Sequence, residues 1–301
     1  MPVKKALIIG AGIAGIATAI RLAVKGYQVN VFEANSYPGG KLSEFEQEGF
    51  RFDAGPSLFT MPQYVDELFR LAGKNPAEFS SYQKLDVVCR YFYEDGTRLN
   101  AYADPEKFAA EINQQTGEPE ASVKKYLKNS SNIYSITSHV FLEQSLHRLK
   151  TYLNWGTVQS VFRFPQIDAF RSVHKANESF FKDERITQLY DRYATYNGSN
   201  PYSAPATLNV IPHLEQHYGA YFPEGGMYSI VTSLVKLAES LGVVFHYNSP
   251  VDEIILEKQT AKAIRIKDDV MLGDVIVSNM DVWFTYHRLL KDHPRLFPKK
   301  S

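Results

Sequence analysis

Three glycines near the N-terminus have the spacing of a phosphate-binding loop. Gly10, Gly12 and Gly15 form the pattern G-x-G-x-x-G. In such a pattern the first glycine permits a tight turn, the second lets the backbone approach a pyrophosphate, and the third lets a helix pack closely on a strand. The N–H groups of a helix that begins at Ile13 and Ala14 would face the phosphates with the positive end of the helix dipole. These residues predict a dinucleotide site.

The segments on either side have the pattern of a β–α–β unit. Lys4–Ile9 ends in an apolar run typical of a buried parallel strand, and Ile13–Lys25 is an apolar helix that Gly26 closes. Gln28–Phe32 is the second strand. Glu33 follows it directly, where a carboxylate can bond the ribose hydroxyls of an adenosine. A glycine turn without a ligand is the alternative, but the acid at this distance favours a dinucleotide.

Composition limits the class of protein. The 301 residues suffice for more than one domain, and 33 basic residues balance 33 acidic ones, so charge does not indicate a nucleic-acid partner. The single cysteine, Cys89, excludes an internal disulfide, fits a reducing compartment and reads as a buried strand residue. The apolar stretch at the N-terminus is short for a membrane span and is interrupted by Arg21. We therefore expect a soluble or peripheral protein.

A second glycine-containing segment follows the acid. Pro38-Gly39-Gly40-Lys41 offers another close backbone approach to a ligand, with a cation beside it, and Asp53-Ala54-Gly55-Pro56-Ser57 comes soon after. A domain that binds only NAD does not require this second element. The arrangement is similar to that of flavin enzymes of the glutathione-reductase and amine-oxidase type, which carry Gly-Gly-(Arg/Lys) here and an extended Asp-x-Gly-Pro segment running toward the flavin ring.

Two longer stretches resemble the bacterial carotenoid (phytoene-type) desaturases. They are FEANSYPGGKLSEFEQEGFRFDAGPSLFTMP and YATYNGSNPYSAPATLNVIPHLE, and the strong similarity covers about residues 3–73 and 190–256. Within that family the sequence of these stretches is most similar to that of the 1-hydroxycarotenoid 3,4-desaturases. The resemblance implies an α/β fold: a Rossmann-like FAD-binding domain of the glutathione-reductase/amine-oxidase type with an inserted α+β substrate domain. We expect residues 1–75 and 220–301 to form the FAD-binding domain. Residues 76–219 are expected to form the inserted domain that binds the substrate and faces a membrane.

The resemblance also implies FAD as cofactor and a set of residues that bind it. We expect these to be Gly10, Gly12, Ile13, Ala14, Gly15, Glu33, Ala34, Gly39, Gly40, Lys41, Gly55, Pro56, Ser57, Val251 and Ser278. The segment 197–205 is the candidate wall of the substrate site. No catalytic acid or base is named, because a flavin performs the hard chemistry and the protein orients it and excludes water.

The implied activity is the introduction of double bonds into a long acyclic carotenoid, with oxygen or a quinone as final electron acceptor. A phytoene desaturase or a carotenoid isomerase is an alternative within the family. A flavin amine oxidase and a non-catalytic carotenoid- or lipid-binding protein are alternatives outside it.

The middle of the chain is mostly helical in pattern and rich in aromatic residues. One interpretation is an ordinary helical lid; the other is an amphipathic surface that enters a bilayer interface, with Trp155 at headgroup depth. Because carotenoids reside in membranes, the resemblance favours the second, and so a cytoplasmic protein peripherally bound to a membrane.

Two further groups of polar residues are candidate sites. His213 and His217 would share a helix face, but the motif HLEQH is not the zinc-protease pattern and lacks an evident third ligand, so no metal is expected. Asp191 and Arg192 could act in acid–base chemistry or form an ion pair.

The remaining elements follow from periodicity. We expect helices at Met61–Lys74 and Met227–Leu241, two strands within Lys84–Tyr102, and a helix that Asp104 caps. Four strands are expected at Val243–Tyr247, Val251–Leu256, Ala261–Lys267 and Val270–Val277. Family members continue past the equivalent of Ser301 with a glycine-rich flavin motif, so we expect a C-terminally truncated member with an incomplete site for the flavin ring.

Overall fold

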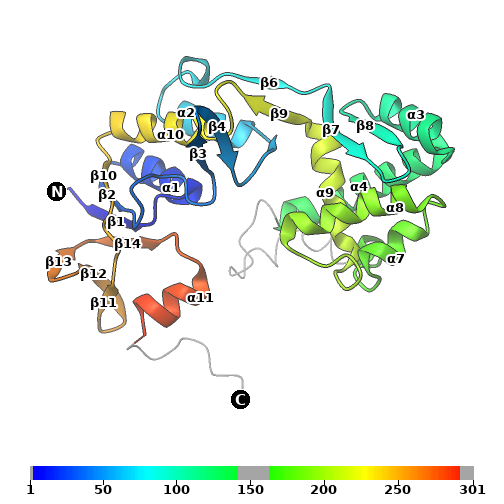
Figure 1. The fold of residues 1–301 in the computed structure, drawn as a ribbon. Coiled ribbons are helices and arrows are strands. Elements are labelled where there is room, and N and C mark those ends of the chain that lie inside the picture. The colour runs from blue at the N-terminus through cyan, green and yellow to red at the C-terminus, as the bar shows by residue number, and fades with distance from the viewer. Residues whose placement is uncertain (1–2, 142–162, 292–301) are drawn as a thin grey trace. The chain divides into compact units, whose positions relative to one another are not determined.

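The chain forms two compact units. The structure, a computed structural model, describes residues 3–141 and 163–291 (Figure 1). Unit 1 consists of Met1–Gln83 and Phe222–Ser301, and unit 2 is Lys84–Tyr221. The chain leaves unit 1 along β6 (Tyr82–Lys84) and returns to it along β9 (Ala220–Pro223).

A parallel sheet lies at the centre of unit 1. Its strand order is β10–β2–β1–β14, and every pair in it is parallel. The bounds are β1 Lys5–Ile9, β2 Gln28–Phe32, β10 Val244–His246 and β14 Val275–Ser278. The last four residues of β1 are buried, which explains their uninterrupted apolar run. Sheet and topology confirm the predicted Rossmann-like fold.

Helices and a small antiparallel sheet cover this core. Helix α1 (Ile13–Val24) packs on β1 and β2 and also contacts α10 (Ser229–Ser240), as Figure 1 shows in blue and yellow. Leu7 and Ile9 of β1 instead share a buried cluster with Ile254 and Ile264 of the antiparallel sheet. That sheet consists of β11 Glu253–Glu257, β12 Thr260–Ile266 and β13 Asp269–Leu272.

The predicted single strand Val270–Val277 is wrong. The run is divided between β13 and β14, which belong to different sheets. Gly273 separates them, and a β-carbon there would lie 2.8 Å from Cγ of Leu7. The chain therefore crosses close to β1 at this glycine, a change of sheet that a continuous apolar pattern does not reveal.

The predicted helix Met61–Lys74 is shorter in the structure. Helix α2 spans Gln63–Leu71, and Met61 has a left-handed φ of 56° that lies outside it. Leu68 and Phe69 are buried, whereas Tyr64 and Leu71 are 49% and 43% exposed. The other elements of unit 1 are β3 Ser43–Gln47, β4 Phe50–Ala54, β5 Phe59–Thr60, η1 Pro76–Glu78, α11 Val282–Phe284 and the π-helix η6 Thr285–Leu289.

The described part of unit 2 combines a β-hairpin with helices, which agrees with the expected α+β character. The hairpin strands are β7 Val87–Phe92, which contains the half-buried Cys89, and β8 Arg98–Tyr102. The helices include α3 Pro105–Thr116, α4 Glu120–Phe141, α7 Val173–Glu178 and α8 Glu184–Asp191. Shorter turns follow as η2 Phe164–Ile167, η3 Arg192–Asn197, η4 Ala206–Val210, α9 Ile211–His213 and the π-helix η5 Leu214–Tyr218.

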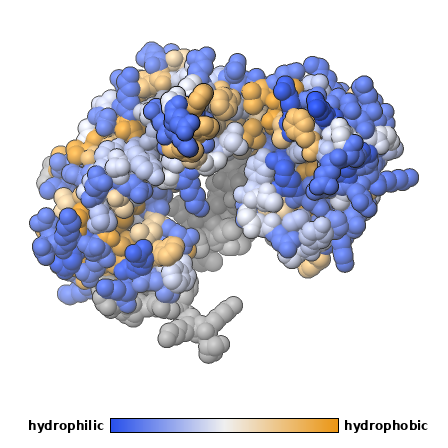
Figure 2. All heavy atoms as spheres, viewed as in Figure 1, coloured by the Kyte–Doolittle hydropathy of each residue, from blue (hydrophilic) through white to orange (hydrophobic). Residues whose placement is uncertain are grey.

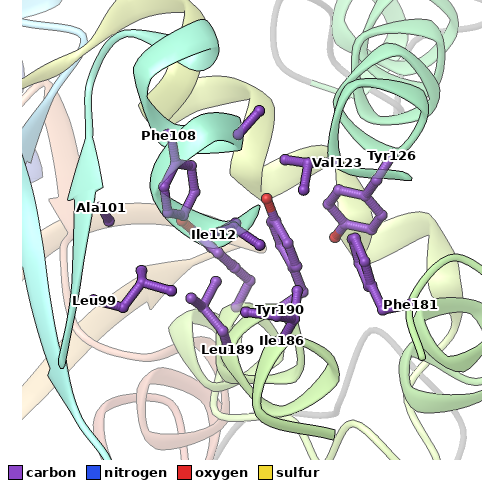
Figure 3. Close-up of a cluster of buried hydrophobic side chains, with 12 residues drawn as sticks. Leu99, Ala101, Phe108, Ile112, Val123, Tyr126, Phe181, Ile186, Leu189 and Tyr190 are labelled. Carbon is purple, nitrogen blue, oxygen red and sulfur yellow. The ribbon is translucent and has the colours of Figure 1, made fainter. Parts of the chain in front are cut away.

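Aromatic side chains form the core of unit 2 (Figure 3). The ring of Tyr126 lies 4.1 Å from that of Tyr190 and 5.2 Å from that of Phe181, measured between centroids. All three residues are buried. As predicted, Asp104 caps α3, because its carboxylate accepts a hydrogen bond of 2.8 Å from Lys107 N.

Apolar residues also lie at the surface, among hydrophilic ones, on the face drawn in Figure 2. Phe45, Phe50 and Phe52 of the β3–β4 hairpin are 50%, 68% and 46% exposed. None of the helices in the described ranges combines the length and apolar character that crossing a bilayer needs. Trp155, on which the predicted membrane surface partly depended, lies outside the described residues.

Candidate cofactor site

Three strand ends of the parallel sheet bring the candidate residues together. Ile9 is in register with Phe32 of β2 and with Ser278 of β14. The next residue after each strand is therefore placed at the same edge of the sheet: Gly10, Glu33 and Asn279. Ligands of open parallel sheets bind at such carboxyl ends.

The first glycine loop has the geometry that its pattern predicts. Gly10 adopts a φ of 94° and donates a hydrogen bond of 2.7 Å to Phe32 O. A β-carbon at Gly15 would lie 2.1 Å from Gly10 O, so only glycine allows this close packing of helix on strand. Gly12 is the N-cap of α1.

Helix α1 presents free donors at its first turn. The hydrogen bond from Ile16 N to Gly12 O, at 3.0 Å, is the first within the helix. The N–H groups of Ile13, Ala14 and Gly15 precede it and therefore have no acceptor in the helix. Donors at the positive end of a helix dipole form an anion site.

The second glycine pair packs directly on the first loop. Gly39 forms an isolated parallel bridge with Gly12 and donates a hydrogen bond of 2.7 Å to Ala11 O. A β-carbon on Gly40 would lie 3.3 Å from Cα of Gly12. Both glycines have positive φ angles, 108° and 62°. Gly12 and the pair Gly39–Gly40, which are distant in sequence, thus form one surface on which the backbone is not covered by side chains.

The predicted segment after β4 extends this surface. A β-carbon at Gly55 would lie 1.9 Å from the carbonyl oxygen of Lys41, so the two backbones touch. Pro56, Ser57 and the Lys41 side chain are exposed. The preceding Asp53 accepts hydrogen bonds from Met227 N, at 3.0 Å, and Tyr228 N, at 3.3 Å, and so ties β4 to the start of α10.

Glu33 is a buried carboxylate with acceptor capacity to spare. Only 6% of the residue is exposed. Its Oε2 accepts a hydrogen bond of 2.7 Å from Ala11 N, and its Oε1 accepts bonds from Asn35 N and Nδ2, at 2.9 and 3.0 Å. Because an ionised carboxylate has about four lone-pair positions, at least one remains for a ribose hydroxyl.

A cleft within unit 1 lies at this edge of the sheet. Its volume is about 550 Å³. Four of the predicted cofactor residues line it, namely Gly10, Glu33, Ala34 and Val251. The other lining residues are Ile9, Phe32, Pro250, Asp252, Asn279, Met280, His287, Arg288, Leu289 and Lys291. The glycine loops and the free N–H groups of α1 fit the pyrophosphate of FAD. The Glu33 carboxylate fits its adenosine.

Asn279, which is not among the predicted cofactor residues, lines the cleft. Ser278, the predicted residue, does not line it: its hydroxyl pairs with Thr285 Oγ1 at 2.8 Å and accepts a hydrogen bond of 3.3 Å from Met280 N. The rule that places Gly10 and Glu33, one residue past a strand end, would have selected Asn279 had the end of β14 been located.

The polar candidates of unit 2 do not form a comparable site. His213 and His217 stack with centroids 4.8 Å apart, and burial, together with His217, lowers the pKa of His213 to about 4. Across the described part of the chain, no three His, Cys, Asp or Glu side chains are grouped as metal ligands. Asp191 pairs with His174 Nδ1 at 2.7 Å, and Arg192 lies over Tyr193, 4.7 Å from its ring centroid.

A parallel sheet that carries two packed glycine loops at one edge, with the buried carboxylate of Glu33 beside them, defines a dinucleotide-binding domain. Residues 13–300 match the family of flavin containing amine oxidoreductases, and the chain belongs to this family. A flavin is therefore its cofactor class.

Among curated relatives, the chain is 43% identical over 289 residues to a 1-hydroxycarotenoid 3,4-desaturase of Flavobacterium sp. (strain P99-3), covering 96% of this chain and 59% of the relative. It is 31% identical to a phytoene desaturase (neurosporene-forming) of Cereibacter sphaeroides, covering 97% of this chain and 55% of that protein. The chain thus spans less than two thirds of the length of these relatives.

Solved structures confirm the fold. An oxidoreductase from Methanosarcina mazei superposes with a TM-score of 0.64 at 18% identity, over 98% of this chain and 62% of the other. A putrescine oxidase triple mutant gives a TM-score of 0.62 at 17% identity, over 95% of this chain and 59% of the other.

Proposed function

We propose that this protein is an FAD-dependent desaturase that introduces carbon–carbon double bonds into a long acyclic carotenoid, as a 1-hydroxycarotenoid 3,4-desaturase. The observation that carries this proposal is 43% identity across 96% of the chain to a protein of that name. The site in unit 1 supports the cofactor, because the Glu33 carboxylate in the cleft and the surface formed by the two glycine loops suit the adenosine and pyrophosphate that distinguish FAD from a flavin mononucleotide.

Different residues of the chain bind different parts of this cofactor. The free N–H groups of Ile13, Ala14 and Gly15 bind the pyrophosphate, and Glu33 accepts from the ribose. Val251 borders the adenine. When bound, the flavin supplies a hydride acceptor, and oxygen or a quinone is the proposed final electron acceptor. The segment 197–205 in unit 2 is the proposed wall for the polyene.

An amine oxidase is the second candidate. It is favoured by the family match and by the similarity of the fold to a putrescine oxidase. The carotenoid relatives are closer in sequence, at 43% and 31% identity against 17% for the putrescine oxidase structure. This difference in sequence identity favours a carotenoid over an amine as the substrate.

Pigment analysis tests the substrate class. The protein is expressed in a host that accumulates 1-hydroxylated acyclic carotenoids, and in a second host that accumulates unhydroxylated ones. We expect a product with two hydrogens fewer per new bond in the first host and little change in the second. Unchanged pigment in both hosts, or peroxide formation from amines by the purified protein, would reject the proposal.

We also propose that the protein acts in the cytoplasm as a peripheral membrane protein. A polyene substrate dissolves in the bilayer, so the enzyme must extract it there. Flotation with liposomes made from lipids of the carotenoid-producing host tests this. Protein in the floating fraction supports the proposal, and protein that stays at the bottom with and without carotenoid contradicts it.

A further inference from the structure

Asn279 occupies the space that the glycine loop leaves empty. Its Nδ2 lies 2.8 Å from the position of a β-carbon on Gly12 and 3.1 Å from that on Gly15. The same atom is 3.9 Å from the position on Gly10. All three glycines of the fingerprint therefore face one carboxamide, which belongs to a residue far away in the sequence.

The backbone fixes this placement, while the side chain keeps its hydrogen-bonding capacity. Asn279 N donates a hydrogen bond of 2.8 Å to Ile9 O, which continues the pairing of β14 with β1. Among residues 3–141 and 163–291, no group is hydrogen-bonded to the carboxamide of Asn279. The residue is partly exposed and lines the cofactor cleft.

The free amide donor lies beside other free donors. Among the residues that the structure describes, the N–H groups of Ile13, Ala14 and Gly15 also have no hydrogen-bond acceptor, and they follow Gly12 directly. Donors cannot satisfy one another, so a neighbouring group of them favours an acceptor with negative charge. A pyrophosphate is such an acceptor, and a neutral nucleoside is not.

We propose that Asn279 is a phosphate-binding residue of the cofactor cleft, whose carboxamide completes the anion site of the glycine loop from the end of the neighbouring strand β14. This inference rests on the proposed function in that it takes FAD as the ligand. It adds a side chain from the last strand to a site otherwise built from backbone groups. The glycines then serve two purposes, approach of the ligand and accommodation of Asn279.

The test compares ligands with and without phosphates on the full 301-residue chain. Dissociation constants for FAD, ADP and adenosine are measured by calorimetry for the wild type, Asn279→Ala and Asn279→Asp. We expect Asn279→Ala to weaken FAD and ADP about 10-fold, the loss of a hydrogen bond to a charged group. Asn279→Asp, which is isosteric but negative, should weaken both on the order of 100-fold. Adenosine should change less than about twofold in both variants.

Controls separate this inference from folding and from the cofactor proposal. Asn75→Asp adds the same charge to unit 1 at a helix cap where aspartate is accepted, and should leave all three affinities unchanged. Thermal melting of the ligand-free variants checks that they fold. Equal losses for ADP and adenosine, or no loss with ADP, would overturn the role of Asn279 while leaving the FAD site intact. A wild-type chain that binds neither FAD nor ADP would overturn the cofactor proposal and this inference with it.

Discussion

At the scale of single residues, we propose that Glu33 recognises the ribose of the cofactor. Its carboxylate is held by Ala11 N and Asn35 N and still has a free acceptor position. We expect Glu33→Gln to weaken the binding of FAD and adenosine about 10-fold, because an amide replaces one charged acceptor oxygen with a donor.

Fluorescence quenching of FAD and calorimetry with adenosine measure this change. Glu257→Gln, at the exposed end of β11, is the matched control and should bind as the wild type does. Wild-type adenosine affinity in Glu33→Gln would contradict the role assigned to the carboxylate.

Gly15 tests the close packing of α1 on β1. An alanine there would place its β-carbon 2.1 Å from Gly10 O, so the helix must move. We expect Gly15→Ala to lower the free energy of unfolding by about 1–3 kcal/mol and to weaken FAD binding as well. Gly26→Ala meets nothing within 4 Å, so its effect is limited to the strain of a φ of 82°. Urea unfolding compares the two, and equal FAD affinity in both variants would contradict the prediction.

Sequence reasoning at this scale located the residues whose chemistry depends on type and spacing. The glycine fingerprint and Glu33 lie at the predicted sheet edge, and Gly39, Gly40 and Gly55 join them through backbone contacts. Asn279 was not among the predicted residues, because a carboxamide has no characteristic spacing. Its role depends on the register of β14 with β1.

At the scale of elements, a carboxylate ties the β3–β4 hairpin to α10. Asp53 accepts hydrogen bonds from Met227 N, Arg51 and Tyr228 N, and Tyr228 OH donates to Pro38 O beside the second glycine pair. Burial alone would raise the pKa of Asp53, but these hydrogen bonds outweigh it and hold the pKa below its ordinary value of 3.8.

This pKa makes the stability of unit 1 depend on pH. Because the folded pKa lies below the unfolded one, Asp53 stabilises the fold above about pH 4 and loses that contribution as the pH falls through the folded pKa. We expect Asp53→Asn to lower the free energy of unfolding by about 1 kcal/mol at pH 7. The difference from wild type should shrink below pH 4. Unfolding by urea at several pH values measures it, and a difference that is constant with pH would contradict the role of the charge.

Element boundaries were predicted less well than element types. The helix at 61–74 is shorter because the chain enters it through a left-handed Met61. The apolar run 270–277 contains a change of sheet at Gly273, where the chain passes close to the side chain of Leu7. Both errors arise because tertiary contacts decide where an element ends.

At the scale of the whole molecule, the two units should respond differently to ligand. All residues of the proposed FAD site belong to unit 1, and the aromatic core of Figure 3 belongs to unit 2. We expect ADP at about 100 times its dissociation constant to stabilise unit 1 by about 2.7 kcal/mol. Hydrogen exchange should then show protection in unit 1 strands and little in α8. Equal protection of both units would contradict a site confined to unit 1.

The measurement that most directly tests the proposed activity follows the cofactor and the substrate in the same reaction. The purified FAD-loaded protein is mixed anaerobically with a 1-hydroxylated acyclic carotenoid while flavin absorbance and pigment are recorded. The proposed function predicts that the flavin bleaches as a carotenoid with one further double bond appears, and that amines leave the flavin oxidised. Bleaching by an amine but not by the carotenoid would contradict it.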